Sequence, residues 1–529
     1  MLDLLIKGGW ILDGTGSHAR RLDLGIVAGR IVFLAPPPAP AAAQVIDVQG
    51  RFVTPGFFDL HAHSDLRLLQ DPRAESKVFQ GVTTETVGLC GYSCAPLHGP
   101  SGTELAGEIE DEYGFRPAWD SFGSYLAALE ERGTAVNVAG FVGQGTIRQM
   151  AAGFKAGPVN RDGMRLMQRL LTESLAEGAF GLSTGLIYPP GCYADTGELV
   201  ELAACLAARG GIYTTHLRDE GDDLLPAVAE ALTIGERAGV PVHLCHHKAA
   251  GRRNWGKTGA SLAMVDAARR GGQDVTLDVY PYLATSTVLS AVLPPWVQEG
   301  GPLCALERLT GGEIRDRIKA ELEGRASQEP GIWEDIVISH VRNPALAHLQ
   351  GRSLARIALD SRVRPVEMLM DLLVEEQLKV SMIRFAMGDD DLDRVIRHPQ
   401  SMIGSDAGAR SFRNHLTEGR PHPRCFGTFP RILGHYVRER GVLSLAEAVR
   451  KMTSLPASRL GIRDRGVIDK GFWADLVVFD PLRIRDRATY EDPFQPPEGI
   501  SLVIVNGRVV VRDGRHSGLL AGMVLKSGG

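Results

Sequence analysis

The 529-residue sequence lacks long apolar runs, and this absence argues against a membrane-spanning protein. Its longest hydrophobic stretches, such as VTPGFF and ADLVVF, have the length of a strand, whereas a transmembrane helix needs about 18–20 apolar residues. The N-terminal segment MLDLLIKGGWILDG also lacks the basic start and long apolar block of a signal peptide. We therefore expect a soluble protein that is not exported.

The sequence also lacks a strong excess of charge of either sign, and it contains few cysteines. Lys and Arg number 58 against 63 for Asp and Glu, which gives a net charge of −5 without long runs of either sign. This balance favours neither nucleic acid nor an anionic membrane as a partner. The seven cysteines are odd in number and widely scattered, which does not suit a disulfide framework. A reducing compartment, the cytoplasm, is the expected location.

Segments with two different textures divide the chain. Residues 1–55 and 465–529 are β-rich with glycines at the turns, and we expect them to form one small β-sandwich domain built from both termini. Two unrelated β tails are the alternative. Between them, in residues 56–464, strand-like segments alternate with amphipathic helical stretches. Eight such strands predict an α/β fold, a (β/α)8 TIM-like barrel.

The eight expected barrel strands are followed by the residues on which the functional argument depends. They lie in FFDLHAH, TTETVGLC, AVNVAGFVGQ, AFGLSTGL, GIYTTHL, PVHLCHHK, DVTLDVYPY and SMIGSDAG. Two further strand candidates, DIVISHV (335–341) and KVSMIRFAM (379–387), precede the last of these segments. We interpret residues 290–350, approximately, as an insertion into the barrel and leave the place of KVSMIRFAM open.

Two histidines spaced one residue apart end the first expected barrel strand, in GFFDLHAHSD. Because side chains alternate along a strand, His61 and His63 project from the same face. They are poor core residues, since they repel each other when protonated and need hydrogen-bond partners when buried and neutral. Two imidazoles on one face are, however, well suited to binding one metal ion.

Further metal-binding residue types follow other expected strands, where barrel enzymes place their chemistry. Each has an ordinary explanation: a lone cysteine is usually a small buried residue, and an aspartate in SDAG could cap a helix. Their joint occurrence at one rim nevertheless predicts a metal site. The candidate ligands are His61, His63, Cys90, His216, His246 and Asp406.

These motifs carry a resemblance to a known family. GFFDLHAHSD resembles the opening motif of the metal-dependent amidohydrolase superfamily. The wider set resembles the N-acyl-D-amino-acid deacylases (D-aminoacylases) and covers nearly the whole chain. Its members are GVTTETVGLCGYSCAP, FGLSTGLIYPPG, YTTHLRDEGD, HLCHHK, DVYPY, IGSDAG and PHPRCFGTFPR. The resemblance implies a zinc-dependent hydrolase that cleaves N-acyl-D-amino acids to a D-amino acid and a carboxylate.

The resemblance also implies roles for the candidate ligands. Cys90, His216 and His246 would hold a tightly bound zinc ion. A second, weaker metal position, which could share Cys90, would be lined by His61, His63 and Asp406. The neighbouring His247 would then be a packing residue, because adjacent strand residues point to opposite faces.

Proton transfer and substrate binding are assigned by the same resemblance. Asp406 would take a proton from water and return it to the departing nitrogen; a plain ligand role is the alternative. Arg424, in PHPR, would bind the substrate carboxylate bidentately. Further substrate-side positions are matched by Tyr188, Lys248, Tyr280 and Ser286. Their ordinary readings remain open, because DVYPY could be core and Lys248 a solvated loop residue.

Three alternatives and one specificity prediction complete the interpretation. The first alternative is action on D-dipeptides, and the second is action on cyclic amides. Relatives that open cyclic amides use a carboxylated lysine near the fourth strand, whereas AFGLSTGLIY contains no lysine. A non-catalytic scaffold is the third, although scaffolds normally lose ligands and none is missing here. The segment after Ser286 reads TVLSAVLPPW, and no basic residue occurs between Ser286 and Arg308. We therefore predict neutral, mostly hydrophobic substrate side chains, unless Lys248 or an arginine from a distant loop supplies a cation. The acyl group and the oligomeric state are not predicted.

Overall fold

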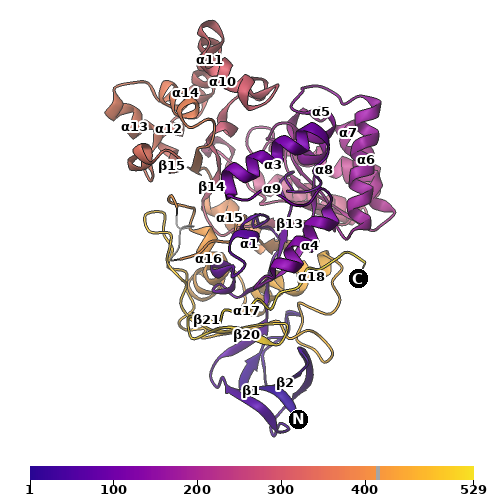
Figure 1. Cartoon of the computed structure of the whole chain (residues 1–529). Coiled ribbons are helices and arrows are strands. Elements are labelled where there is room, and N and C mark those ends of the chain that lie inside the picture. The colour runs from indigo at the N-terminus through magenta and orange to yellow at the C-terminus, as the bar shows by residue number, and fades with distance from the viewer. Residues whose placement is uncertain (413–417, 529) are drawn as a thin grey trace.

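The computed structural model describes residues 1–412 and 418–528. Figure 1 shows a β-rich region around the N-terminus, a central body of strands and helices, and a mainly helical region at the opposite end. The central body is the predicted barrel, and the helical region is inserted between two of its strands.

The barrel strands are parallel and pair in sequence order, in sheets β6-β7-β8 and β9-β10-β11-β12-β13-β17. Backbone contacts join the two sheets at both ends. β8 and β9 are successive parts of one chain segment, and Ala62 after β6 forms a parallel bridge with Ala407 after β17. All eight expected strands are therefore present. Their bounds are β6 (Phe57–Asp59), β7 (Val82–Val87), β8 (Asn137–Gly140), β9 (Val142–Gly143), β10 (Gly181–Gly185), β11 (Ile212–His216), β12 (Val242–Leu244), β13 (Val275–Val279) and β17 (Ser401–Ile403).

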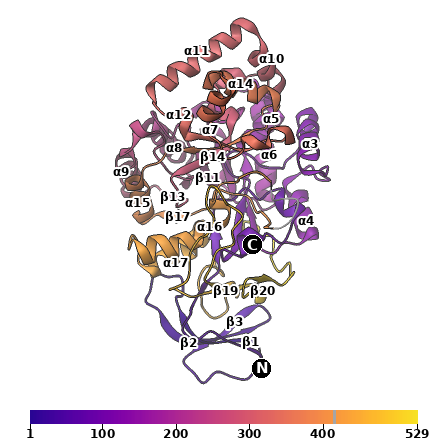
Figure 2. The same cartoon turned by 90° about the vertical axis from the view of Figure 1, so that its left-hand side faces the viewer.

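Helices cover the outside of the strands, so that the strands are buried on both faces, as in other parallel sheets. α6 illustrates the pattern: Met167, Leu171 and Leu175 repeat every four residues and are buried, and the Asn160 side chain caps the helix by accepting from the Gly163 N–H at 2.8 Å. No helix among the described residues is both long and apolar enough to cross a membrane. The covering helices include α4 (Phe122–Arg132), α6 (Arg161–Ala176), α7 (Thr196–Ala207), α8 (Leu224–Ala238), α9 (Lys257–Arg270), α15 (Asp389–Arg397) and α17 (Leu445–Met452) (Figure 2).

Both ends of the chain contribute to one β domain. Its strands form a continuous sheet in the order β21-β20-β19-β18-β5-β1-β2-β3, with β4 beside β1. The antiparallel β5–β18 pairing joins the N-terminal and C-terminal parts, which excludes two unrelated tails. The strands are β1 (Leu2–Ile11), β2 (Arg20–Val27), β3 (Arg30–Ala35), β4 (Ala42–Asp47), β5 (Phe52–Pro55), β18 (Leu476–Phe479), β19 (Ile500–Val505), β20 (Arg508–Arg512) and β21 (Arg515–His516).

The sheet of the β domain folds over its own apolar core. The Ile31 N–H donates to the Phe472 carbonyl, so the β3 edge meets the segment before β18. The final residues leave this domain, whereas the sequence suggested that the C-terminal part continues in it to residue 529. The Leu525 N–H donates to the Val138 carbonyl of β8 at 2.7 Å, which fixes the C-terminal segment on the barrel.

The insertion is larger than residues 290–350. It begins with β14 (Ala284–Val288) and ends with β16 (Ser381–Phe385), and these strands pair antiparallel with β15 (Ile336–His340) in the order β14-β16-β15. KVSMIRFAM is therefore the central strand of the inserted sheet and not a barrel strand. The inserted helices are α10 (Pro302–Thr310), α11 (Gly312–Gln328), α12 (Ile332–Asp335), α13 (Leu354–Ser361) and α14 (Pro365–Glu375). They share an apolar core of their own that includes Leu309, Ile318 and Leu369.

Candidate metal-binding active site

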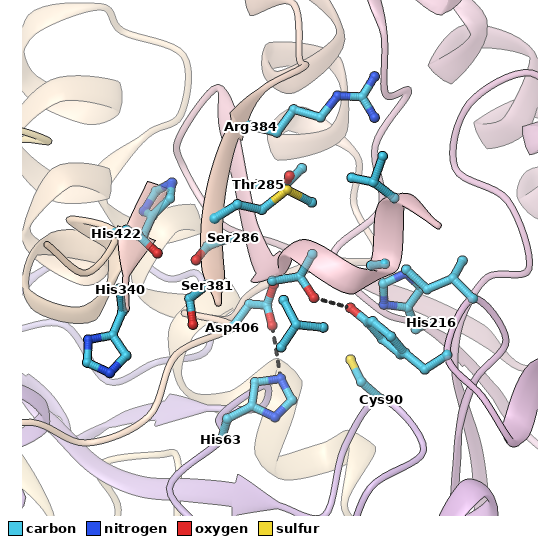
Figure 3. Close-up of a pocket in the computed structure, with 18 of the residues that line it drawn as sticks. His63, Cys90, His216, Thr285, Ser286, His340, Ser381, Arg384, Asp406 and His422 are labelled. Carbon is cyan, nitrogen blue, oxygen red and sulfur yellow. Dashed lines mark hydrogen bonds and ion pairs between the residues drawn. The ribbon is translucent and has the colours of Figure 1, made fainter. Parts of the chain in front are cut away.

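A cavity of about 1810 Å³ lies where the barrel strands end and the insertion begins. Figure 3 shows side chains from the barrel rim and from the inserted strands facing one another across this space. His61 is fully buried behind the wall. The other sequence-predicted site residues all line the cavity, namely His63, Cys90, Tyr188, His216, His246, Lys248, Tyr280, Ser286, Asp406 and Arg424.

Several candidate ligands have an unusual backbone conformation. Cys90, His246 and Asp406 lie two or three residues beyond the ends of β7, β12 and β17 and have φ angles of 51°, 33° and 51°. A non-glycine residue rarely adopts this left-handed conformation, and such residues cluster at functional sites where the surrounding structure holds them. The three side chains are therefore turned into the cavity by the loops that begin at these strand ends.

One group of donor atoms brings four candidate ligands together. His61, Cys90, His246 and Asp406 each offer an atom within 4.8 Å of the others. The Cys90 Sγ lies 3.2 Å from His61 Nε2 and 3.4 Å from His246 Nε2, and Asp406 Oδ1 lies 3.5 Å from His61 Nε2. A thiol, two imidazoles and a carboxylate are ligand types that zinc accepts.

His216 belongs to a second group, with Glu220 and His246. The Nε2 atom of His216 lies 3.6 Å from Glu220 Oε2. Burial holds the pKa of His216 well below its ordinary value, and neither ring nitrogen has a hydrogen-bond partner among the described residues. A buried neutral imidazole with unpaired nitrogens fits a metal ligand. His246 is common to both groups, whereas the expected trio with Cys90 does not form a group by itself.

Asp406 connects the metal-ligand residues with the substrate side of the cavity. Its Oδ1 atom accepts a hydrogen bond from His63 Nε2 at 3.0 Å (Figure 3). Its Oδ2 atom lies 2.8 Å from Arg424 Nη1. Burial alone would raise the pKa of Asp406, but Arg424 and the nearby imidazoles hold this pKa well below its usual range. The carboxylate is therefore ionised and able to bind a cation or accept a proton.

Two carboxylates that the sequence argument missed support the histidines. Asp278, buried at the end of β13, accepts hydrogen bonds from His61 Nδ1 at 3.0 Å, His243 Nε2 at 2.8 Å and the His246 backbone N–H at 2.9 Å. Such contacts orient a ligand imidazole and leave its other nitrogen for the metal. Because Asp278 lies within DVYPY, the strand pattern suggested a core position.

Glu220 is the second missed carboxylate. It accepts a hydrogen bond from His246 Nδ1 at 2.9 Å and forms a close ion pair with Lys248. Burial alone would raise its pKa, but Lys248 and the two histidines lower it below the ordinary range. Its position in the motif YTTHLRDEGD, four residues after His216 in a loop at the barrel rim, was the available signal.

The predicted substrate-side residues surround the free space next to Asp406. The Arg424 guanidinium lies 4.6 Å from the centre of the Tyr280 ring, and Lys248 Nζ lies 5.8 Å from it. The Tyr280 hydroxyl is buried and has no partner in the described part of the chain. Two cations, each also paired with a carboxylate, and an unpaired hydroxyl therefore face the same space. His247, by contrast, bonds through Nε2 to Ser261 Oγ at 2.7 Å.

The inserted strands supply the opposite wall. The Arg424 Nη2 atom donates to the Ser286 carbonyl on β14 at 3.1 Å, and the Tyr188 hydroxyl bonds to Thr287 Oγ1 at 2.8 Å. The Tyr188 ring packs edge-on against His216, with 5.2 Å between ring centres. The apolar residues that follow Ser286 also line the cavity, with Val288, Val292 and Leu293 among them.

Comparisons with known proteins agree with this site. The model of a family described as "Amidohydrolase family" matches residues 44–511. An N-acyl-D-glutamate deacylase of Alcaligenes xylosoxydans xylosoxydans is 38% identical over 510 residues, covering 96% of this chain and 93% of that protein. A D-aminoacylase of the same organism is 37% identical over 525 residues, covering 99% and 97%.

A solved structure is similar to this chain over nearly its whole length. The N-acyl-D-glutamate deacylase from Bordetella bronchiseptica, complexed with zinc and a phosphonate inhibitor that mimics the tetrahedral intermediate, superposes with a TM-score of 0.82 at 36% identity. The superposition covers 99% of each chain. The family match and the full-length relatives lead to one conclusion: the chain belongs to the amidohydrolase family.

Proposed function

We propose that this protein is a zinc-dependent deacylase that hydrolyses the amide bond of N-acyl-D-amino acids and releases a D-amino acid and a carboxylate. One observation carries the proposal: Asp406 belongs to the buried donor group of His61, Cys90 and His246 and also contacts Arg424. The site thus joins a metal-binding group to a group that recognises a carboxylate. The names of the relatives support the same reaction and D stereochemistry.

The donor groups support zinc as the cofactor. In the proposal Cys90, His216 and His246 hold the tightly bound ion, and a second, weaker position is lined by His61, His63 and Asp406. The unpaired nitrogens of His216 and the closeness of Cys90 to two imidazoles fit this use. When bound, zinc activates a water molecule and polarises the amide carbonyl.

Asp406 is the proposed proton carrier. Its carboxylate is held ionised by Arg424 and lies against the metal-ligand residues, so it can accept the proton of the attacking water and deliver it to the departing nitrogen. Amide cleavage needs this delivery because an amine anion is a very poor leaving group. His63, bonded to the same carboxylate, orients it.

Arg424 and Tyr280 are the proposed anchors for the substrate carboxylate, together with Lys248. The guanidinium can form paired hydrogen bonds with a carboxylate, and the unpaired Tyr280 hydroxyl can donate a further one. Tyr188 and Ser286 shape the space in which the acyl amide lies, since both contact residues at the floor or wall of the cavity.

Neutral side chains remain the proposed preference, and the alternatives are weaker. Val288, Val292 and Leu293 offer an apolar wall. Cyclic amides are disfavoured because β10 (Gly181–Gly185) reads GLSTG and contains no lysine to bridge two metals. A scaffold function is disfavoured because every expected ligand type is in place around the cavity. A reducing, cytoplasmic location belongs to the proposal, since Cys90 must remain a thiol.

A stereochemical activity screen tests the function. The zinc-supplemented protein is incubated with the N-acetyl derivatives of leucine, methionine and glutamate in both enantiomeric forms, with D-dipeptides and a hydantoin as further arms, and free amine is measured. We expect release from D-enantiomers only, together with bound zinc in the purified protein. Preferential hydrolysis of L-enantiomers, or activity confined to dipeptides or hydantoins, would overturn the proposal.

A further inference from the structure

An arginine from the insertion lies in the cavity wall, although no basic residue follows Ser286 closely in the sequence. Arg384 is on β16, and its pairing partner on β14 is Thr285; two residues along, Met382 pairs with Thr287. Side chains on a strand alternate, so Arg384 and Met382 share a face of the sheet with Thr285 and Thr287. All of these residues line the cavity.

This face of the inserted sheet points toward the metal-ligand residues. Thr287 bonds to Tyr188, whose ring packs against His216. Arg384 lies two residues further out than Met382, which corresponds to roughly 7 Å along the strand. Figure 3 shows Arg384 beyond Thr285, on the side away from Asp406 and His63. The guanidinium therefore lies at the outer end of a wall whose inner end contacts the reaction site.

Arg384 is not a free cation. Its Nη2 atom donates to Oε1 of Glu329, which follows α11, and both side chains are mostly buried, with 23% and 15% of their surface exposed. Arg253, another arginine that lines the cavity, pairs with Asp222. The wall thus combines a charged pair at its outer end with the apolar side chain of Met382 further in.

We propose that the Arg384–Glu329 ion pair is the specificity-determining element of the substrate side-chain subsite, where it selects neutral over charged D-side chains. This inference rests on the proposed deacylase function. An acidic side chain next to the pair meets the Glu329 carboxylate, and a basic one meets the Arg384 guanidinium. In both cases a charged side chain must lose its solvation next to a like charge, while the opposite charge is already compensated within the pair. A neutral side chain packs against Met382 at no such cost.

Removing one partner of the pair should make the enzyme accept a substrate side chain with the charge of the removed partner. Glu329→Gln keeps the size of the side chain but leaves the Arg384 charge uncompensated, so a substrate carboxylate can take its place. Arg384→Met keeps the length of the side chain but frees the Glu329 carboxylate for a substrate ammonium group. A hydrogen bond to a charged group is worth enough to change kcat/KM roughly tenfold to hundredfold.

The experiment measures kcat/KM for N-acetyl-D-leucine, N-acetyl-D-glutamate and Nα-acetyl-D-lysine. We expect the parent to prefer the leucine compound. Glu329→Gln should raise the glutamate-to-leucine ratio by at least tenfold, and Arg384→Met should raise the lysine-to-leucine ratio similarly. The double variant should lose both gains. Glu323→Gln is the matched control, because Glu323, on α11, pairs with Arg364 before α14 and neither residue lines the cavity. This variant should leave both ratios as in the parent.

The outcomes distinguish a failure of the proposed side-chain selection from a failure of the proposed deacylase function. Two results would overturn the proposed selection by the Arg384–Glu329 pair while leaving the deacylase function intact. One is unchanged ratios in both single variants. The other is a parent that already prefers the glutamate compound and loses this preference in Arg384→Met. Failure of the parent to hydrolyse any of the three compounds would overturn both. If Glu329→Gln does not fold, the Arg384→Met arm with the lysine compound still decides.

Discussion

Arg424 and Asp406 form a buried ion pair in which the arginine Nη1 atom lies 2.8 Å from Oδ2 of the aspartate. The sequence comparison suggested separate tasks for the two residues, substrate anchoring for the arginine and proton transfer for the aspartate. The contact places the two tasks side by side. Under the proposed function, a substrate whose carboxylate reaches Arg424 is therefore bound next to the carboxylate that we propose accepts and returns a proton.

Asp406→Asn should abolish most of the activity without emptying the site. The amide keeps the size of the side chain and some coordinating ability but cannot carry the proton, and general acid–base groups contribute about 10²–10⁴-fold. We expect turnover to fall by at least this factor while the tightly held zinc, measured by metal analysis, stays. Asp469→Asn, at an exposed position in the β domain, is the control. Turnover within a few-fold of the parent would eliminate Asp406 as the proton carrier.

Cys90→Ala should lose zinc and activity together. The Cys90 Sγ atom lies near two candidate imidazole ligands, so its removal leaves the tight site with imidazole donors alone, and thiolate is a preferred zinc ligand. Zinc content per chain and turnover are measured on the same preparation. Cys304→Ala, in the inserted α10, should keep both. If Cys90→Ala retains full zinc and near-normal turnover, the thiol is not a ligand.

Local sequence patterns were sufficient to predict the barrel and to find most of the residues that the structure brings together around the cavity. The strand ends could be recognised because buried parallel strands are apolar, and the polar residues that follow them, such as His61 and Cys90, stand out by contrast. The rim of a barrel then brings these residues together, whatever their distance in sequence. The roles given to individual ligands rested on resemblance.

Residues whose importance depends on distant contacts could not be found in this way. Asp278 reads as part of a core strand, and only the folded barrel shows its bonds to His61 and His246. Arg384 enters the cavity because the inserted sheet places β16 beside β14, and the register of these strands could not be predicted from local patterns. The extent of the insertion was underestimated for the same reason.

Lys77→Met should destabilise the protein strongly. Lys77 Nζ lies fully buried between Asp59 at 2.7 Å and Glu85 at 3.3 Å, and it donates to the Ala407 carbonyl at 2.7 Å, next to Asp406. Removing one partner of a buried ion pair leaves an uncompensated charge and costs about 3–5 kcal/mol. Denaturant unfolding should show a loss of this size.

An exposed lysine provides the control for this measurement. Lys526 pairs with Glu130 near the surface, with about half of each side chain exposed, and exposed pairs contribute only about 0–1 kcal/mol. Lys526→Met should therefore unfold nearly as the parent does. Equal stabilities for the Lys77→Met and Lys526→Met variants would show that the buried lysine does not hold the two carboxylates in place.

His247→Asn should make stability less dependent on pH in the acidic range. Burial lowers the pKa of His247 to about 4, and its ring bonds to Ser261, whereas an unfolded histidine has a pKa of about 6.5. Above pH 6.5 the ring is neutral in both states. As the pH falls from about 6.5 toward 4, the unfolded state binds a proton that the folded state does not, so stability is lost at up to about 1.4 kcal/mol per pH unit. Between pH 7 and pH 5 this amounts to about 2 kcal/mol, and asparagine, which does not titrate, should remove that share.

Denaturant unfolding of the zinc-free protein at both pH values measures the difference, since removing the metal excludes its release in acid as a cause. His348→Asn, at an exposed position in the insertion, should keep the pH dependence of the parent. If His247→Asn loses as much stability between pH 7 and pH 5 as the parent does, His247 binds the same number of protons in the folded and unfolded states over this range, and burial does not hold its imidazole neutral.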